Sequence, residues 1–373
     1  MKKLICLIVI LIFSSFCGPK KDKIERIIED GVLHVKNPES PLKGTVELDI
    51  DKIREIDPYQ YKEVGLKNMR FKRDSDGTVI IYDASSSNVE AHIISSDGKY
   101  LGRFLRLGQG PGEFPEYSGI KIYFKSDKIM VTGGRKLAIF DKRGNFITEN
   151  KVEYDPVILL DEDRYFIYEV RVQKEDRQEK IILKERIREE ESDFKDTLFF
   201  EAKNVGIIYT DVGAFADSWA TPRIAYSFDH KEQRCYVALN TEYKIYVKNL
   251  NGETQHVIER KYDKVQLNLK DKKELVFRET FVPYYPDKLV TFQLIFPLPR
   301  GYLGVKRVSG LKQYEIDVFD PDGRYVYVIN LDDKSLFNSA QYFPGGFATV
   351  KETDDGILYQ EFLIKNLPEI FKD

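Results

Sequence analysis

The sequence is poor in the residue types that build disulfide frameworks and most metal sites. Its 373 residues include three cysteines, four histidines, three methionines and one tryptophan. Cys6 and Cys17 lie at the extreme N-terminus, so Cys235 alone remains in the body of the chain, and a lone cysteine forms no internal disulfide. No two histidines stand at H-x-H or H-E-x-x-H spacing. The sequence therefore predicts no metal centre and no cofactor, and Cys235 is expected to be a small buried apolar residue.

The chain also lacks an excess of either charge. Lysine and arginine number 58 and acidic residues 61, a net charge of −3. Nucleic-acid-binding domains usually carry a basic surplus, so this balance argues against a nucleic-acid partner. The serines at 84–87 lie outside any G-x-S-x-G elbow. No segment of the sequence contains a recognisable catalytic motif.

The only long apolar run lies at the N-terminus. Leu4–Phe13 follows two lysines and is too short to span a bilayer, but it fits the core of a secretory signal peptide. Cys17 followed by Gly18 resembles a bacterial lipoprotein processing site, at which the cysteine is lipidated and becomes the new N-terminus. We expect a signal peptide over 1–16, a lipidated tether over 17–30 and a lipid-anchored protein of the bacterial cell envelope, facing the periplasm or the cell surface. Plain secretion and an uncleaved membrane anchor are the alternatives.

Against these absences stands one pattern that occurs four times. Two strands of alternating apolar residues, joined by a polar turn that closes on glycine, recur at 89–102, 136–148, 244–257 and 315–328. The turn glycines are Gly98, Gly144, Gly252 and Gly323. The gap of 108 residues between the middle two is about twice a repeat length of roughly 56, so one degenerate repeat lies inside it. At this spacing, residues 31–373 hold about six repeats.

Six such repeats predict an all-β, six-bladed β-propeller of four-stranded antiparallel blades, folded as one domain over 31–373. A linear β-solenoid is the alternative, but its repeats are much shorter. The C-terminal segment is short of a full blade, so we expect an N-terminal strand within 31–50 to complete it and close the ring. In the degenerate blade (153–205) we expect two exposed strands around "KIILKERI" rather than a solvated helix. Residues 269–281 show helical apolar spacing and predict a short helical insertion before blade five.

The segment "FLRLGQGPGEF" (104–114) resembles the G-x-G-P-G-E-F signature of NHL-type repeats. With the leader and "DGVLHVKNP", the chain resembles the bacterial six-bladed β-propeller lipoproteins related to NHL proteins, which implies a fold and a location more than a function. We expect the segment to be a structural crossing between blades, in which glycines adopt positive φ, a proline fixes the turn and a phenylalanine anchors the core. These residues are Gly108, Gly110, Pro111, Gly112 and Phe114. A phosphate-binding loop is the alternative, but it needs a following helix, and the sequence that follows is strand-like.

Ligands of propellers generally meet the loops between blades and the mouth of the central channel, and this predicts a recognition set. The set comprises Arg106, Glu113, Arg135, Trp219, Arg223 and Arg307. An exposed tryptophan with nearby arginine suits sugar stacking or the capture of acidic groups, although Trp219 can equally pack between blades. Four aspartates occupy turn or strand-end positions, where they bind neighbouring amides, with calcium coordination as the alternative. They are Asp76, Asp83, Asp97 and Asp141.

The sequence thus predicts a membrane-tethered, non-enzymatic propeller that binds a protein, peptide or glycan at the cell envelope. The alternative is a propeller enzyme, a lyase or lactone hydrolase, which would need a metal in the central channel. At least three acidic, asparagine or histidine side chains that converge on one point there would favour the enzyme.

Overall fold

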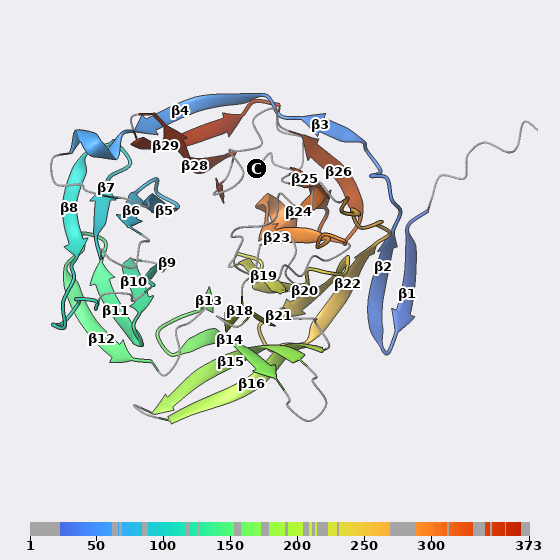
Figure 1. Cartoon of the computed structure of the whole chain (residues 1–373), viewed down its shortest axis with the longest axis horizontal. Coiled ribbons are helices and arrows are strands. Elements are labelled where there is room, and N and C mark those ends of the chain that lie inside the picture. Colours follow the sequence, from blue (N-terminus) through green and yellow to red (C-terminus); the bar gives the residue numbers. More distant parts are fainter. Residues whose placement is uncertain are drawn as a thin grey trace, which may run out of the picture.

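The structure is a computed structural model, in which residues at the N-terminus, at the C-terminus and in several connections are not described. It describes residues 23–61, 66, 69–83, 89–115, 119–125, 127–152, 158–172, 179–190, 193–203, 209–210, 213–214, 223–229, 231–268, 288–311, 313–330, 340–343, 345–354 and 356–366. Strands dominate these residues, and six antiparallel sheets stand around a central axis as the blades of a six-bladed β-propeller (Figure 1). The expected fold class is confirmed.

Each blade runs outward from the axis, with its first strand innermost (Figure 1). Blade one holds β5 (Met69–Arg73), β6 (Val79–Asp83), β7 (Ala91–Ile94) and β8 (Tyr100–Leu105). Blade two holds β9 (Lys121–Lys125), β10 (Lys128–Gly133), β11 (Lys136–Asp141) and β12 (Phe146–Lys151). Blade three holds β13 (Ile158–Leu159), β14 (Arg164–Val172), β15 (Glu179–Glu190) and β16 (Asp193–Lys203).

Blades four to six follow the same plan. Blade four holds β19 (Ile224–Asp229), β20 (Arg234–Leu239), β21 (Lys244–Asn249) and β22 (Thr254–Arg260). Blade five holds β23 (Phe292–Pro297), β24 (Leu303–Gly310), β25 (Gln313–Phe319) and β26 (Tyr325–Asn330), and blade six holds β27 (Gln341–Phe343), β28 (Gly346–Thr353) and β29 (Gly356–Ile364). The remaining small elements are β17 (Tyr209–Thr210), β18 (Gly213–Ala214) and two 3-10 turns, η1 (Pro58–Gln60) and η2 (Pro299–Gly301).

The N-terminal segment runs around the outside of the last three blades (Figure 1). Its strands are β1 (Glu25–Glu29), β2 (Val32–Asn37), β3 (Thr45–Glu47) and β4 (Ile50–Ile56), which we call the N-terminal belt. Within the belt β1 and β2 form a hairpin; β2 then pairs in parallel with β22, β3 pairs in parallel with β26, and β4 pairs antiparallel with β29. The belt therefore adds strands to three consecutive blades.

Two sequence-based expectations need correction. Of the region 31–50 that was expected to pair with the last blade, only Ile50 lies in β4, whereas β2 and β3 pair with blades four and five. The stretch "KIILKERI" does form a strand, but it lies in the single long strand β15, where Leu183 and Glu185 are buried rather than exposed. The predicted helical insertion at 269–281 lies outside the described residues.

The repeated hairpin turn has one local cause. The aspartate or asparagine that opens the turn accepts hydrogen bonds from the amides two and four residues later, and a glycine between them takes positive φ. Asp141 Oδ1 accepts from the backbone amides of Arg143 (2.8 Å) and Asn145 (2.9 Å), and Gly144 has φ +83°. Asn249 and Asp320 make the same bonds in blades four and five. Of the four aspartates that the sequence places at turns, Asp141 is therefore a turn cap, and Asp76 likewise accepts the amide of Thr78 at 2.8 Å.

Candidate functional site

Residues at β19 of blade four and β23 of blade five line a groove. Figure 1 shows these two strands as the innermost of neighbouring blades. Its volume is about 440 Å³, a size typical of small-ligand sites. The lining residues are Arg223, Ile224, Ala225, Tyr226, Gln293, Leu294 and Ile295. This lining, as far as the structure describes it, holds one positive charge, no acidic side chain and several apolar groups.

Two local features shape this groove. Arg223 precedes β19 and is fixed at both ends, because its amide donates to Asn240 Oδ1 (2.8 Å) and its guanidinium donates to the carbonyl of Gln293 (2.8 Å). The ladder between β23 and β24 shifts register between Phe292 and Leu294. A bulge of this kind re-aims side chains. Leu294 lies beside the bulge and is 43% exposed, which is unusual for leucine on an inner strand.

A second cation lies on the neighbouring strand. Lys306 of β24 stands opposite Leu294 in the ladder, and its ammonium lies 3.7 Å from the centre of the Tyr314 ring. Only 6% of Lys306 is exposed. Burial, followed by the charge of Arg223, lowers the pKa of Lys306 to about 8. Tyr314 belongs to the apolar core between blades five and six, so Lys306 lies on that side of blade five and outside the described lining of the groove.

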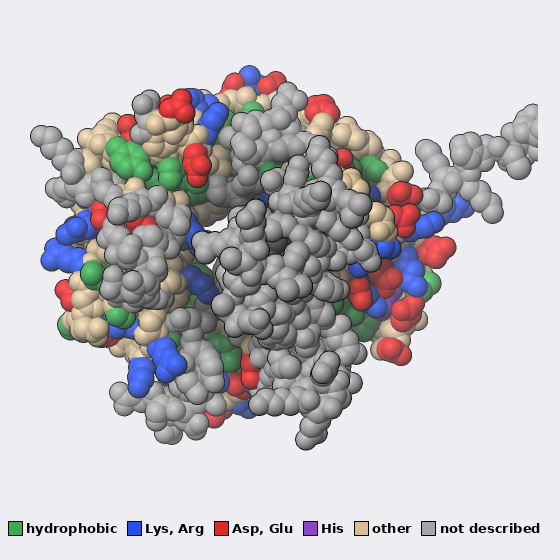
Figure 2. All heavy atoms as spheres, in the orientation of Figure 1, with side chains coloured by type: hydrophobic (Ala, Val, Ile, Leu, Met, Phe, Trp, Pro, Cys, Tyr) green, Lys and Arg blue, Asp and Glu red, His purple; other side chains and the backbone are tan. Residues whose placement is uncertain are grey.

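The innermost strands of blades one and two are also basic. β5 reads "MRFKR" and β9 reads "KIYFK", and neither contains an acidic residue. Figure 2 shows Lys and Arg side chains beside the small central opening, on the side of β5 and β9. Burial lowers the pKa of Lys72, with the charge of Arg70 as the second cause. Part of this charge is balanced within the fold, because Arg73 Nε lies 3.4 Å from the buried carboxylate of Glu361.

Three residues of the predicted recognition set lie away from this groove, around the glycine-rich crossing between blades one and two. Arg106 and Arg135 are exposed there, and Arg135 sits in the tight turn between β10 and β11 with φ +62°. Glu113 is half-buried, and its Oε2 accepts the amide of Gly110 at 3.0 Å. Lys136 ties the crossing to blade two by donating to the carbonyls of Gly110 and Glu113.

The crossing itself has the predicted structural character, with one exception. Phe114 is fully buried in the apolar core between blades one and two. Gly112 has φ +71°, and its amide donates to Glu149 at 2.9 Å. Gly110, however, is not among the residues with positive φ, so the expected conformational reason for glycine fails at that position.

Arg307 was expected at the open end of the ring, and the structure places it instead in a buried ionic cluster between blades four and five. Its Nε lies 2.9 Å from Asp317 Oδ2, and Asp317 is fully buried. Asp317 also accepts from Arg260 (2.6 Å), and the hydroxyls of Tyr243 (2.5 Å) and Tyr325 (2.9 Å) complete its shell. Each lone-pair region of the carboxylate is used, so this cluster clamps two blades together.

Sequence reasoning missed Asp317, although a signal was present. Asp317 and Tyr325 are eight residues apart on the two strands of the blade-five hairpin and are joined by a hydrogen bond. The blade-one hairpin places His92 and Tyr100 at the same separation and joins them in the same way, at 3.0 Å. Comparison of polar residues at equal positions in the repeats would have singled out this pair.

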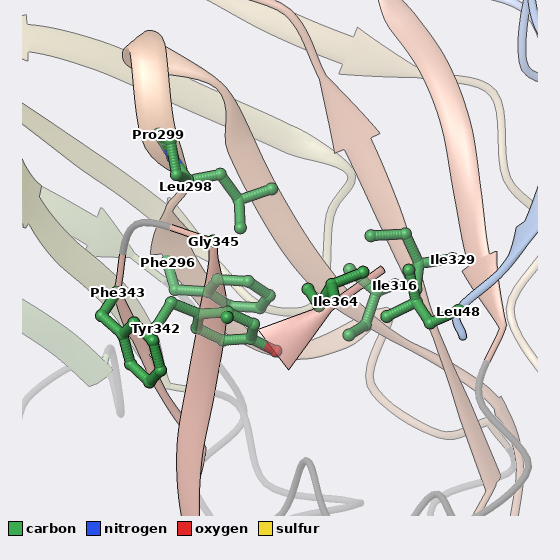
Figure 3. A pocket seen from close by; sticks show the side chains of 11 residues that line it. Leu48, Phe296, Leu298, Pro299, Ile316, Ile329, Tyr342, Phe343, Gly345 and Ile364 are labelled. Carbon is green, nitrogen blue, oxygen red and sulfur yellow. The ribbon is translucent and has the colours of Figure 1, made fainter. Parts of the chain in front are cut away.

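The seam between blades five and six holds an apolar cavity, shown in Figure 3. Phe296 and Tyr342 stack face to face within it, with ring centres 4.5 Å apart. Leu298, Ile316 and Ile364 supply further apolar wall. Its volume of about 10 Å³ admits no more than a water molecule, so it is part of the core rather than a ligand site.

One group of described residues has metal-ligand character, and it lies on the outside of the ring. Glu29 and His34 of the belt meet Glu259 of β22, with His34 Nδ1 2.6 Å from Glu259 Oε1. Lys36 lies 2.8 Å from Glu29, and Lys244 lies 3.6 Å from Glu259. The two lysines balance the two carboxylates, so the group acts as an ion-pair network that holds the belt to blade four.

Other predicted residues have simpler outcomes. Cys235 is fully buried, and burial raises the pKa of its thiol to about 12, which confirms the expected inert apolar role. Trp219 and Cys17 lie outside the described residues. None of the helices in the part of the chain that the structure describes is long and apolar enough to cross a bilayer.

Comparisons with known proteins agree with this architecture. Residues 62–231 match the DUF5128 family, described as a 6-bladed beta-propeller. A crystal structure of a DUF4221 family member from Bacteroides vulgatus is similar, with a TM-score of 0.52, 12% sequence identity, and coverage of 86% of this chain and 99% of the other. A protein of Bacteroides fragilis predicted to be exported has a TM-score of 0.48, 10% identity, and coverage of 89% and 100%. No curated protein matches the sequence. The chain is therefore a six-bladed β-propeller with similarity to the DUF5128 family over residues 62–231.

Proposed function

We propose that this chain is an exported, lipid-anchored propeller related to NHL proteins, which binds a ligand at the cell envelope without transforming it. The observation that carries the proposal is the groove between β19 and β23. It is built on rigid strands, has the volume of a small-ligand site and combines exposed apolar surface with a fixed guanidinium. Such a mixture orients and holds a ligand but supplies no general base or nucleophile.

The enzyme alternative gains less support from the side chains. A metal-dependent lyase or lactone hydrolase would need acidic, asparagine or histidine side chains that converge in the channel. Among the described residues, the group that converges in this way is Glu29, His34 and Glu259, on the outer edge of blade four and paired with lysines. The groove lining contains one amide, Gln293, and no carboxylate or imidazole in its described part.

Site-specific photocrosslinking in native envelopes tests the binding role. A photoreactive phenylalanine analogue at Leu294 should capture a discrete ligand, because this side chain is exposed inside the groove. The matched control is the same analogue at Leu363, which is 40% exposed but lies on β29, away from the groove. Equal capture at both positions, or none at Leu294, would contradict the proposal.

The anchor is tested separately through Cys17. Cys17→Ser should abolish acyl labelling and release the protein from membranes, since attached acyl chains supply the membrane affinity. Unchanged membrane partitioning of this variant would indicate an uncleaved apolar leader instead. Neither result bears on the groove, so location and binding are judged independently.

A further inference from the structure

We propose that the innermost strands of blade one bind a small dianion, carried by a phosphate or a dicarboxylate, through Arg70, Lys72 and Tyr82. We call these three residues the dianion site. They lie on β5 and β6, away from the groove between blades four and five, so the site is independent of the function proposed for that groove. Two cations on one face of a strand, both without a counter-charge, and a buried hydroxyl without a partner carry the inference.

The two cations lie on the same face of β5, the innermost strand of blade one. In the ladder with β6, Arg70 stands opposite Tyr82, and Lys72 stands opposite Ile80. Residues opposite each other in such a ladder share a face. Ile80 and Tyr82 belong to the apolar core between blades one and two, so both cations lie on the side of β5 that faces blade two. A strand rises about 3.3 Å per residue, which separates their Cα atoms by about 7 Å, so one small anion fits between the two side chains.

Neither cation has a counter-charge in the part of the chain that the structure describes. Arg70 and Lys72 make no hydrogen bond or ion pair there. Asp74, two residues beyond Lys72, is already paired with Lys142 of blade two. Burial lowers the pKa of Lys72, and the positive charge of Arg70 lowers it further. A half-buried ammonium beside a second positive charge is costly, and an anion held between the two would offset both effects.

The third group is the hydroxyl of Tyr82. Tyr82 is 4% exposed, and its hydroxyl has no hydrogen-bond partner among the described residues. Buried hydroxyls nearly always have a partner, and an oxygen of a bound anion would be one. Burial raises the pKa of Tyr82, and Arg70 lies close enough that its charge acts in the opposite direction. The phenol is therefore a protonated donor beside the guanidinium.

The chemistry of these groups selects the charge of the ligand. A guanidinium and an ammonium only donate hydrogen bonds, and the phenol donates as well, so the site suits an oxygen-rich anion. Two unpaired positive charges match a dianion better than a monoanion, and a phosphate monoester carries a charge of about −1.5 to −2 at pH 7. Arg70 is exposed and Lys72 is half-buried. Figure 2 shows Lys and Arg side chains beside the central opening on this side of the ring, which gives a small molecule access.

Isothermal titration calorimetry of the intact protein with inorganic phosphate, succinate and acetate tests the inference. We expect at least one of the two dianions to bind about tenfold or more tightly than acetate, and its affinity to fall as sodium chloride is added. Binding of phosphate alone identifies the phosphate group as the source of the charge, and binding of succinate alone identifies the dicarboxylate. Equal affinity for acetate, or no binding of either dianion, would overturn the proposal.

Substitutions with matched controls locate the site. Arg70→Gln and Lys72→Met each remove one charge, and Tyr82→Phe removes one hydroxyl; each should weaken dianion binding by about tenfold. The controls are Arg103→Gln and Lys99→Met on the outer hairpin of the same blade, which should keep wild-type affinity. Lys72→Met should melt no lower than wild type, because it removes an unpaired half-buried charge, and this separates lost binding from lost folding. Wild-type affinity in all three site variants would contradict the assignment.

Chemical protection gives a second readout on the unmodified sequence. A succinimidyl acetate reagent acetylates free amines, and peptide mass spectrometry measures the rate at each lysine. A dianion at about ten times its Kd should slow acetylation of Lys72 about tenfold, because only the unbound site reacts, and should leave Lys99 unchanged. Equal protection of the two lysines would indicate non-specific binding and overturn the site. The groove is judged separately by crosslinking at Leu294, so failure of the dianion site leaves the proposed function standing.

Discussion

The two halves of the ring solve the problem of exposed strand edges differently. In blades four and five the outer strands β22 and β26 are covered by β2 and β3 of the belt, and β4 forms the outer strand of blade six (Figure 1). In blades one to three, the outer strands β8, β12 and β16 pair on one side within the described residues. These bare strands expose Leu101, Ile147 and Leu198, whereas β22 and β26 expose no large apolar side chain.

The halves also differ in what holds neighbouring blades together. Between blades four and five, Asp317 joins two arginines and two tyrosines in a buried ionic cluster. Between blades one and two the core is apolar and includes Phe114, Ile122 and Phe140, and Lys142, which is 31% exposed, makes an ion pair with Asp74 across the seam. Apolar seams tolerate small shifts, but buried charge clusters have one satisfied geometry. The seam between blades four and five therefore adds a fully buried ionic cluster to an apolar core that includes Ile245, Phe292 and Val305, whereas the seam between blades one and two relies mainly on packing.

The strongest test of this difference between the two seams removes the carboxylate at the centre of the ionic cluster. Asp317→Ala leaves Arg260 and Arg307 buried without their shared carboxylate, and we expect a loss of about 3–5 kcal/mol in the free energy of unfolding. Urea unfolding measures this loss. The control is Asp322→Ala in an exposed turn of the same blade, which should change stability by less than about 0.5 kcal/mol. Similar losses in the free energy of unfolding for the two substitutions would show that the buried cluster stabilises the fold no more than an exposed side chain does.

A second substitution opens the belt without touching the cluster. Asn37 is buried where the belt crosses from blade four to blade five; its amide donates to the carbonyls of Glu259 (3.1 Å) and Gly323 (2.9 Å), and its oxygen accepts the amide of Tyr325 (2.8 Å). Asn37→Ala leaves these groups unpaired, and we expect a loss of about 2–3 kcal/mol.

Hydrogen exchange gives the local readout for this variant. Amides of β22 and β26 should exchange faster in Asn37→Ala and approach the rates of β8 and β12, because their outer edges open. Asn330→Ala removes an exposed contact with Glu47 of the belt and should leave exchange nearly unchanged. Uniformly faster exchange around the whole ring would contradict a role confined to the belted half.

In the bare half, the crossing glycines provide a matched pair. Gly112→Val should cost about 1–3 kcal/mol, since φ +71° is strained for a β-branched residue and a Cβ there would lie 2.8 Å from Phe146. Gly110→Val should cost less, because Gly110 lacks positive φ and a Cβ would meet only the flexible end of Glu113, at 3.0 Å. Thermal melts compare the two variants. Equal losses would show that backbone conformation at Gly112 is not the cause.

A feature could be predicted from the sequence when its interacting residues lie close together in the chain. The hairpins were predictable because Asp141, Asn249 and Asp320 bind amides within four residues of themselves. The belt was not predictable in this way. Its strand β2 pairs in parallel with the distant strand β22, for example Leu33 with His256, and this pairing leaves no local pattern in either segment. Of the predicted recognition set, Arg223 alone lies in the groove that the structure describes, and Leu294 was missed because a bulge rather than a sequence motif exposes it.

The smallest expected effect concerns Lys306, whose ammonium is buried beside the ring of Tyr314 in the belted half. Its folded-state pKa is about 8, below its ordinary value of 10.5, so folding is penalised fully below pH 8. As the pH rises from 8 to 10.5, the unfolded chain holds more protons than the folded chain, and this lysine's contribution to stability increases.

Lys306→Met should therefore stabilise the protein at pH 7 by about 1–2 kcal/mol, part of the gain being offset by the lost contact with Tyr314. Urea unfolding of wild type and variant at pH 7 and pH 10 measures the difference, which should shrink at the higher pH. Lys99→Met, at an exposed turn, should show no such dependence. A stabilisation that is equal at both pH values would mean that packing, rather than the buried charge, explains it.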